Sequence, residues 1–211
     1  MDQVLGESAN KGFTGIRAAL VAIIERIAQD VPDVPEPVKM YLAGGVAVNF
    51  YTGSRPTRDV DASFSRRLLL PPFNELVVPY TGPDGEVRSL YLDLNYNTSF
   101  AVVHEDAELD SWLVQGAQFE NRKIELRVFA PVDLAVSKLA RFADNDQADI
   151  AALARERLFS PKQLKDRADD ALRYYVGRVA PVEFNLRDAI RIVRDAQREA
   201  RKGSRDHGHE R

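Results

Sequence analysis

The sequence predicts an α+β protein in which a mixed sheet with flanking helices is followed by a C-terminal helical part. Three observations predict this class. Apolar residues recur at helical spacing near the start of the chain, short apolar segments bounded by turn residues fill its middle, and helical patterns return after Pro131. The 211 residues suffice for one core or two small domains. We expect an α/β core over residues 1–130, a helical part packed on it over 131–203, and a disordered tail over 204–211.

The first predicted elements are a helix, a strand and a second helix. Residues 13–30 place apolar side chains at intervals of three and four, and the prolines of segment 31–37 end this helix. Residues 38–45 are typical of a buried strand that runs into a glycine turn. The short helix over 46–53 is expected to end at Gly53, because glycine favours the left-handed backbone that follows a helix.

The middle of the chain is predicted to form strands. Residues 58–64 are expected to form one strand, and residues 74–97 a hairpin whose turn is Gly-Pro-Asp-Gly. Segments 101–114 and 122–130 are strand-like in part. Together these segments supply the mixed sheet.

Four helices are predicted after this sheet. Pro131 suits the first position of a helix, because its missing N–H group is not needed there. Ser160 and Gln163 form a capping-box pattern, and Asn185 is a plausible helix cap. The expected helices cover residues 131–143, 146–158, 160–176 and 185–200.

Composition excludes several classes of site. The chain has no cysteine, which excludes disulfides, thiolate zinc sites and cysteine nucleophiles. Its net charge of −3 argues against a broad surface that coats nucleic acid, although a local basic groove remains open. We expect a cytoplasmic protein without a signal peptide or a membrane partner, because no apolar run approaches the roughly 20 residues of a membrane span.

The C-terminal segment is locally basic. We interpret residues 186–211 as a solvated helix face followed by a frayed end, because acidic residues interrupt the basic ones. The basic residues are Arg187, Arg191, Arg194, Arg198, Arg201, Lys202 and Arg205.

A pair of aspartates in the predicted strand 58–64 is the first candidate for chemistry. Residues i and i+2 of a strand point to the same face, so Asp59 and Asp61 are expected to project together. Carboxylates beside a core are costly unless something binds them, and oxygen-only ligands suit Mg²⁺ or Mn²⁺. We therefore expect these two residues to hold a divalent metal ion.

Residues around this pair are suited to binding phosphate. Gly44 and Gly45 follow a strand and precede a helix, so backbone N–H groups can approach a phosphate there. Arg55, Thr57 and Arg58 lie just before the aspartates and are candidates to contact phosphate oxygens. The chain has neither a P-loop motif nor the glycine spacing of a dinucleotide site. Metal ligands, a glycine turn and cations together indicate phosphoryl or nucleotidyl transfer.

At these positions the sequence resembles the nucleotidyltransferase superfamily. This resemblance implies that the mixed sheet has the polymerase-beta-like fold. A G-G motif after the first strand and a D-x-D motif on the second match the glycine and aspartate pairs described above. The closer resemblance is to the AbiEii/AbiGii (MenT-like) toxin-type nucleotidyltransferases and their uncharacterised relatives. Their G-G-x-A and R-x-[ST]-x-D-[IV]-D motifs match residues 44–47 and 55–61.

The resemblance covers residues 38–175 approximately and implies a second set of site residues. The relatives carry a D-L-x-x-x-K-L motif on a helix, here Asp133 to Leu139 with Lys138 as the lysine. They then carry D-x-x-D-[IL], which here places aspartates at Asp146 and Asp149.

Helical spacing groups these residues in pairs. Lys138 and Arg141 are one turn apart on the predicted helix, and Asp146 and Asp149 are one turn apart on the next. A short break between the helices would bring all four together over the metal site. Lysine would neutralise triphosphate charge there, and an aspartate would orient the triphosphate or accept a proton. The alternative is a set of surface ion pairs that contribute little stability.

The superfamily usually adds a third carboxylate to its metal site, and the sequence leaves the identity of that residue open. Asp93 is the first candidate, because its apolar neighbours predict a buried strand beside the site. Glu125 is the second candidate, and the cluster of Glu105 and Asp106 is the third. The adjacent His104 is either a site residue or a structural histidine.

The resemblance implies a metal-dependent enzyme that moves an NMP from an NTP to an acceptor hydroxyl with loss of pyrophosphate. The implied acceptor is an RNA, including tRNA 3′ ends, or a protein side chain. The implied role is a toxin with a separately encoded antitoxin protein. Two alternatives remain, a catalytically silent nucleotide-binding module on the same fold and an antitoxin-like regulatory protein.

Overall fold

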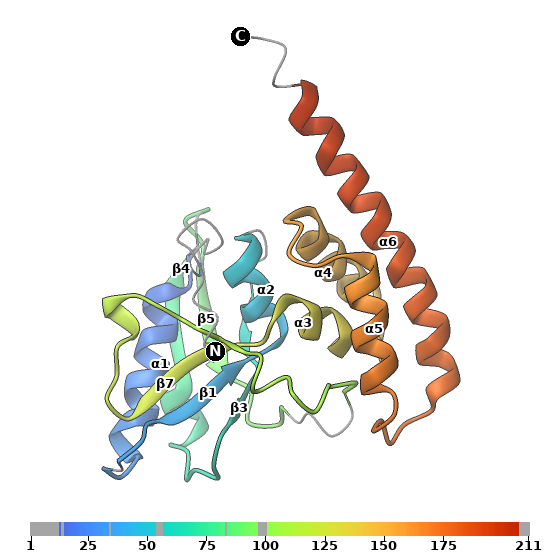
Figure 1. Cartoon of the computed structure of the whole chain (residues 1–211). Helices are drawn as coiled ribbons and strands as arrows, with labels where there is room; N and C mark the ends of the chain where they lie inside the picture. Colours follow the sequence, from blue (N-terminus) through green and yellow to red (C-terminus); the bar gives the residue numbers. More distant parts are fainter. Residues whose placement is uncertain are drawn as a thin grey trace. The chain divides into compact units, whose positions relative to one another are not determined.

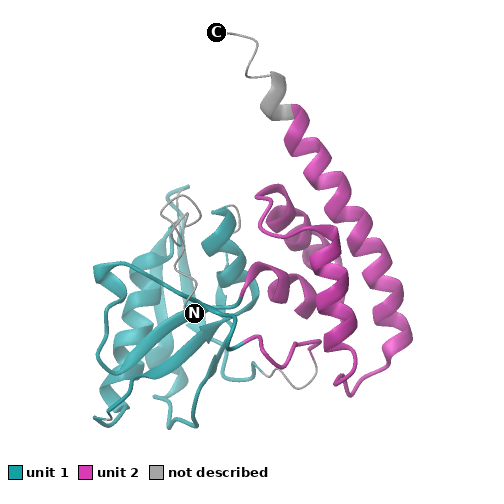
Figure 2. Ribbon diagram, in the orientation of Figure 1, with its two compact units in different colours: residues 1–96, 108–129 teal, residues 97–107, 130–211 magenta. Residues whose placement is uncertain are grey.

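A computed structural model describes residues 13, 15–33, 35–53, 57–82, 84–96 and 101–206, with side chains described as far as residue 202. The chain divides into two compact units (Figure 2). Unit 1 contains residues 1–96 and 108–129, and unit 2 contains residues 97–107 and 130–211.

Unit 1 begins with helix α1, strand β1 and helix α2, in the predicted order. Helix α1 spans Arg17–Asp30 and starts later than expected, because Phe13 and Gly15 have positive φ angles, outside the range of right-handed helical residues. Strand β1 spans Val38–Leu42, and α2 spans Gly44–Thr52. Gly53 follows α2 in the left-handed conformation with φ 64°, so the predicted helix end is confirmed.

Two sheets form the rest of unit 1, and their mixed pairing confirms the predicted α+β class (Figure 1). In the first sheet β1 pairs in parallel with β7 and antiparallel with β3, and β6 pairs antiparallel with the far side of β7. In the second sheet β5 pairs in parallel with β2 and antiparallel with β4. The strands are β2 Asp59–Val60, β3 Ala62–Phe64, β4 Val77–Thr81, β5 Val87–Leu92, β6 Trp112–Leu113 and β7 Ile124–Val128, and short 3₁₀ helices cover Phe73–Leu76 and Ala117–Phe119.

The prediction of a single strand over residues 58–64 is wrong in one respect. The observed segment forms two strands, β2 and β3, which are separated at Asp61. Strand β2 before this residue pairs with β5, and β3 after it pairs with β1. The chain changes partner at the interruption, where the carbonyl of Asp61 accepts a hydrogen bond of 2.9 Å from the Ala43 amide. The segment therefore joins the two sheets at the end of β1.

Unit 2 contains four helices among its described residues: α3 Pro131–Ser137, α4 Asp144–Arg155, α5 Pro161–Ala171 and α6 Val179–Asp206. The capping box of α5 is confirmed, since the Gln163 amide donates to Ser160 Oγ and the Ser160 amide donates to Gln163 Oε1. The prediction for Asn185 is wrong. Helix α6 starts six residues earlier, and the Asn185 side-chain amide donates to the Leu139 carbonyl at 2.8 Å.

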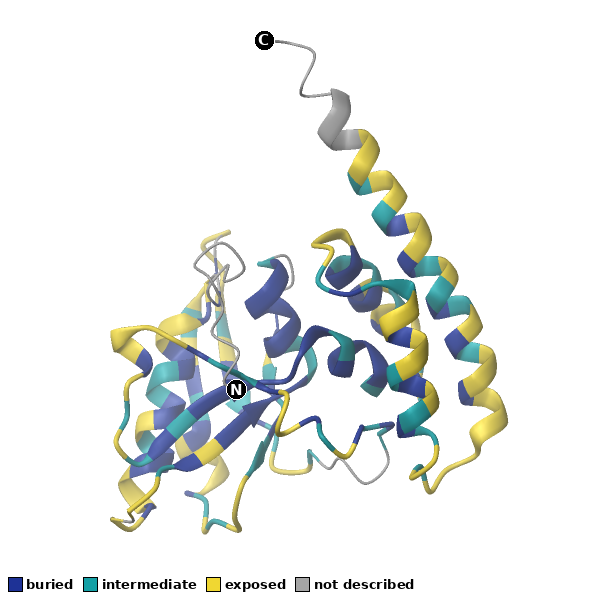
Figure 3. Ribbon diagram, in the orientation of Figure 1, coloured by how far each residue is buried: buried dark blue, intermediate teal, exposed yellow. Residues whose placement is uncertain are grey.

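The longest helix, α6, packs on α4 and α5 through one face. That face consists of small and apolar residues, and the exposed residues follow the other side of the helix (Figure 3). Helix α6 continues to Asp206, so residues 204–206 of the expected tail are helical, whereas residues 207–211 lie outside the described residues. No helix in the described part of the chain has the length and apolar composition needed to cross a membrane. The buried residues of α6 are Val182, Leu186, Ala189, Val193 and Ala196.

Candidate active site

The first group of candidate residues surrounds the start of α2. Gly44 has φ +55°, and a methyl group built on its Cα would overlap Asp61 Oδ2 and lie 2.7 Å from Asp61 Cγ. The Asp61 carboxylate therefore occupies the space that any other residue at position 44 would need. Because the N-terminus of a helix carries a partial positive charge, this location also suits a carboxylate or phosphate.

A buried threonine organises the chain just before the aspartates. Thr57 Oγ1 lies 3.1 Å from the Asp59 carbonyl oxygen and 3.2 Å from Asp59 Oδ1, and its single hydroxyl proton is donated to one or the other. The Tyr80 hydroxyl donates to the Thr57 carbonyl at 3.0 Å. Arg58 is exposed, whereas Arg55 lies outside the described residues. Thr57 thus holds Asp59 through its main chain or its carboxylate, while Arg58 remains accessible to solvent.

Asp93 lies beside this pair, immediately after β5. Strands β2 and β5 run parallel with Val60 opposite Leu92, and the Asp93 amide donates to the Val60 carbonyl at 3.0 Å. Asp93 is therefore level with Asp61 on the neighbouring strand. Asp59, Asp61 and Asp93 are all half-buried, and Asp93 Oδ1 accepts a hydrogen bond of 2.8 Å from the Asn95 amide.

The negative charge of this region affects the pKa of a nearby tyrosine, Tyr96. Burial raises the pKa of the Tyr96 phenol, and the negative charge of Asp61 raises it further. Among the described residues, no three His, Cys, Asp or Glu side chains form a ready-made metal-binding group. Asp59, Asp61 and Asp93 therefore do not form a three-carboxylate metal site in the arrangement described.

The other candidates for the third carboxylate are positioned differently. Glu125 lies on β7, which β1 separates from β3, and its Oε1 pairs with Arg127 at 3.0 Å. Glu105 and Asp106 belong to unit 2. Asp93 is thus the candidate that shares a strand pair with the two aspartates.

His104 has a structural explanation within unit 2. It is buried, its Nδ1 accepts a hydrogen bond of 3.0 Å from the Asp106 amide, and its Nε2 lies 2.7 Å from Asp170 Oδ2. Because Nδ1 accepts, Nε2 carries the proton and donates it to Asp170. This hydrogen bond also lowers the pKa of Asp170.

The second group of candidate residues forms an ion-pair cluster in unit 2. Lys138 Nζ lies 2.6 Å from Asp149 Oδ2 and 3.7 Å from Asp146 Oδ1. The Arg141 guanidinium makes two hydrogen bonds of 2.7 Å to Asp146. The residues therefore form ion pairs, as the alternative interpretation held, but only Arg141 is exposed and the other three are buried rather than at the surface.

A comparison with known protein families identifies the family of this chain. Residues 18–183 match the family described as "Nucleotidyltransferase of unknown function (DUF6036)". The chain belongs to this nucleotidyltransferase family. No curated protein and no solved structure matches it. The match spans both groups of candidate residues, which supports a general role in nucleotidyl transfer.

Within this nucleotidyltransferase the second group is not arranged as predicted. Helix α3 ends at Ser137, so Lys138 and Arg141 lie in the turn after it rather than on a helical face. Arg141 is held instead by Asp146, which also accepts a hydrogen bond of 3.0 Å from the Ala143 amide. Burial would raise the pKa of Asp146, but these hydrogen bonds and the charge of Lys138 outweigh it and lower the pKa. The position of this cluster over the metal site stays a prediction, because the two groups lie in different units.

Sequence reasoning missed several residues of these groups. The negative charge of Asp61 raises the pKa of Tyr96, which places this tyrosine near the first group. Arg167, which makes two hydrogen bonds of 2.7 and 2.9 Å to the buried Asp133, had no signal, because 34 residues separate the partners.

The contact between Gly44 and Asp61 gives a test of this geometry. We expect Gly44→Ala to lower the free energy of unfolding by about 1–2 kcal/mol through its left-handed backbone and by about 1–3 kcal/mol more through the overlap with Asp61. Gly85→Ala is the matched control, because Gly85 has φ +82° but open space around it, and it should show the backbone cost alone. Urea denaturation measures both. Equal losses for the two variants would contradict the described position of the Asp61 carboxylate.

Proposed function

We propose that this protein is a metal-dependent nucleotidyltransferase that moves an NMP from an NTP to a hydroxyl of an RNA, tRNA included, or of a protein. The observation that carries the proposal is the Asp61 carboxylate at the start of α2, beside Asp59 and level with Asp93, in a chain of a nucleotidyltransferase family. A carboxylate beside a helix N-terminus that can bind phosphate suits chemistry on a polyphosphate.

The donor set fits Mg²⁺ or Mn²⁺. Magnesium commonly binds one or two carboxylates together with substrate phosphates and water, so it does not need a protein group of three ligands. Asp59 and Asp61 would hold the ion, and Asp93 would join them as a third carboxylate only after its side chain moved closer. The bound ion would polarise the triphosphate and favour deprotonation of the attacking hydroxyl.

The residues of the chain have separate tasks in this proposal. The amides of Gly44 and Gly45 and the side chains of Arg55, Thr57 and Arg58 would bind phosphate oxygens. The acceptor oxygen attacks the α-phosphorus of the NTP, a new P–O bond forms, and the bond to the β-phosphate oxygen breaks with release of pyrophosphate. The hydroxyl proton passes to a carboxylate or to water.

The second group would complete the site. Lys138 would neutralise triphosphate charge, Arg141 would contact phosphate, and Asp146 and Asp149 would orient the lysine or accept a proton. The motifs shared with AbiEii/AbiGii-type proteins support this assignment and a role as the toxin of a toxin–antitoxin or phage-defence pair, with a cognate antitoxin protein.

A transfer assay tests the proposal. Purified protein is incubated with each α-labelled NTP, with Mg²⁺ or Mn²⁺, and with total RNA or a cell extract, and Asp59→Asn/Asp61→Asn protein is the control. We expect label on RNA or protein only with metal and with both aspartates intact. Absence of label with every NTP and both acceptor pools would overturn the proposal.

A catalytically silent nucleotide-binding module is the second candidate. It is favoured by the ion pairs of Lys138 and Arg141, whose charges are already balanced by Asp149 and Asp146 within unit 2. Metal-dependent binding of an NTP by calorimetry, without transfer in the assay above, would support this candidate instead.

A further inference from the structure

Helix α6 has a basic face that its packing does not explain. The buried residues of α6 lie on one side of the helix, and its arginines lie on the opposite side. Between residues 187 and 202 the helix carries six basic and three acidic residues. In a chain with a net charge of −3, this is a local concentration of positive charge rather than a property of the whole surface.

Three of these arginines form a line. Arg187, Arg194 and Arg201 are exposed, recur every seven residues, and have no acidic partner among the side chains that the structure describes. Seven residues of helix rise by about 10.5 Å and return to nearly the same angle, so the three guanidinium groups follow one side of α6. We call Arg187, Arg194 and Arg201 the arginine row.

The two arginines between the members of the arginine row, Arg191 and Arg198, differ from them because they form ion pairs. Arg191 and Arg198 are also exposed, but they form ion pairs with Asp188 at 2.9 Å and with Asp195 at 3.7 Å. Both aspartates are on the flank of the basic face. These pairs account for the charge of Arg191 and Arg198 locally, whereas the charge of the arginine row is not balanced.

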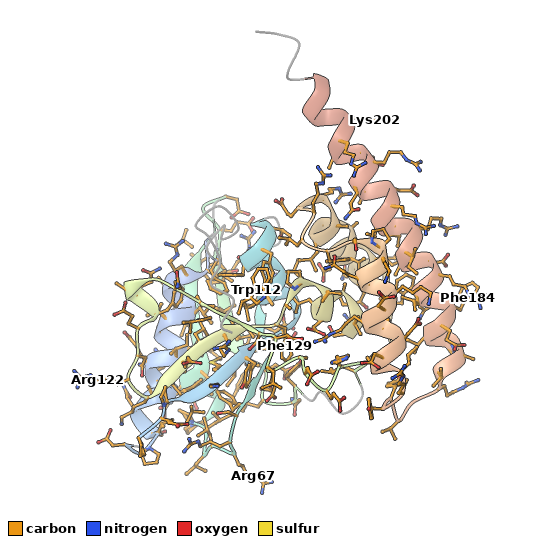
Figure 4. All side chains as sticks on the ribbon, in the orientation of Figure 1. Arg67, Trp112, Arg122, Phe129, Phe184 and Lys202 are labelled. Carbon is orange, nitrogen blue, oxygen red and sulfur yellow. The ribbon has the colours of Figure 1, made fainter. Side chains whose placement is uncertain are left out.

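An exposed aromatic residue lies at the start of the same face. Phe184 is 64% exposed, three residues before Arg187 and seven before Arg191, so its ring shares the basic side of the helix. Figure 4 labels Phe184 and Lys202 near opposite ends of the described side chains of α6. An exposed ring on this face offers a surface on which an unpaired base can stack.

We propose that this face of α6 binds a single-stranded RNA, with the arginine row contacting phosphates spaced along the strand and Phe184 stacking on a base. The proposal deepens the proposed function and rests on it for the identity of the strand as the acceptor. Arginine binds phosphate through paired N–H groups, and aromatic rings stack on any unpaired base. The bases of duplex RNA are paired and stacked on one another, so a ring that stacks on a base favours an unpaired strand.

An acidic protein is the other polyanion that this face suits electrostatically. The row favours RNA over such a partner, because guanidinium groups and an exposed ring together match phosphates and bases. DNA shares both chemical features, so the experiment includes RNA, DNA and an acidic peptide.

The test is a binding titration in which fluorescence anisotropy measures the fraction of RNA bound. The probe is a labelled, unstructured RNA oligonucleotide, and the protein carries Asp59→Asn/Asp61→Asn and is assayed without NTP or metal. In this background Arg187→Gln/Arg194→Gln/Arg201→Gln is compared with Arg66→Gln/Arg67→Gln/Arg122→Gln, which removes the same charge from exposed positions of unit 1. Figure 4 labels two of these control positions, Arg67 and Arg122.

We expect the arginine-row variant to bind RNA about tenfold more weakly and to lose about 2 units from the slope of log K against log salt, because roughly 0.7 unit is lost per phosphate contact. The control variant should change the affinity for RNA less than about twofold, because its three substituted arginines lie in unit 1 and not on α6. Phe184→Ala should weaken binding about fivefold or more through lost stacking. Glutamine is a good helix former, so circular dichroism should report unchanged helicity.

Three results would overturn the proposal. The first is equal RNA affinity of the arginine-row and control variants. The second is binding of DNA but not RNA. The third is binding of a polyglutamate peptide, dependent on the arginine row, in place of RNA. Because no turnover is measured, failure of nucleotidyl transfer would leave RNA binding by α6 intact, and failure of RNA binding would leave transfer to a protein acceptor intact.

Discussion

Asp61→Asn is expected to reduce nucleotidyl transfer at least about a thousandfold. The substitution removes a negatively charged ligand of the metal ion that would stabilise the charge on the phosphate in the transition state. Asparagine has nearly the same size as aspartate, and the Ala43 amide donates its hydrogen bond to the main-chain carbonyl of Asp61, which the substitution keeps. The fold should therefore be retained. Initial rates of label transfer, together with the urea unfolding midpoint, measure the two effects separately.

The controls for this variant use other carboxylates of unit 1. Asp84→Asn changes an exposed residue of the β4–β5 turn and should leave transfer unchanged. Asp93→Asn should reduce transfer far more than Glu125→Gln, because Asp93 is level with Asp61 whereas Glu125 is separated from it by β1. Asp61→Asn protein that kept more than a tenth of the wild-type rate would rule out the assigned metal ligand.

Elements with a strong local signal were predictable from the sequence. The periodicity of residues 13–30, the left-handed glycine after α2 and the capping box before α5 each depend on residues within a few positions of one another. The α+β class follows from their order. Asp59 and Asp61 were recognisable as site candidates for the same reason, since their spacing and the preceding glycines are local features.

Features that depend on distant partners were not predictable. The interruption at Asp61 exists because the chain exchanges β5 for β1 as its neighbour, and single-sequence patterns do not encode the choice of neighbour. The early end of α3 accompanies contacts from elsewhere, including the Asn185 side chain on the Leu139 carbonyl. The burial of Lys138 was missed because helical spacing shows which residues share a face but not whether that face is covered.

Lys138→Met is expected to lower the free energy of unfolding by about 3–5 kcal/mol, because it leaves the Asp149 carboxylate buried without the cation that lies 2.6 Å from it. Lys165→Met is the matched control. Lys165 forms an exposed i,i+4 ion pair with Asp169, so its loss should cost less than about 1 kcal/mol. Urea denaturation compares the two, and equal losses would contradict the buried position of the Lys138–Asp149 pair.

The double variant Lys138→Met/Asp149→Leu separates a structural role of this pair from a catalytic one. Replacing both charges with apolar side chains of similar size is often neutral for stability, so we expect most of the lost free energy of unfolding to return. If Lys138 contacts the triphosphate, as the proposed function requires, transfer should stay abolished although the fold has recovered. If the pair only joins the turn after α3 to α4, transfer should return together with stability. Measuring both quantities on one protein therefore decides whether the Lys138–Asp149 pair belongs to the active site.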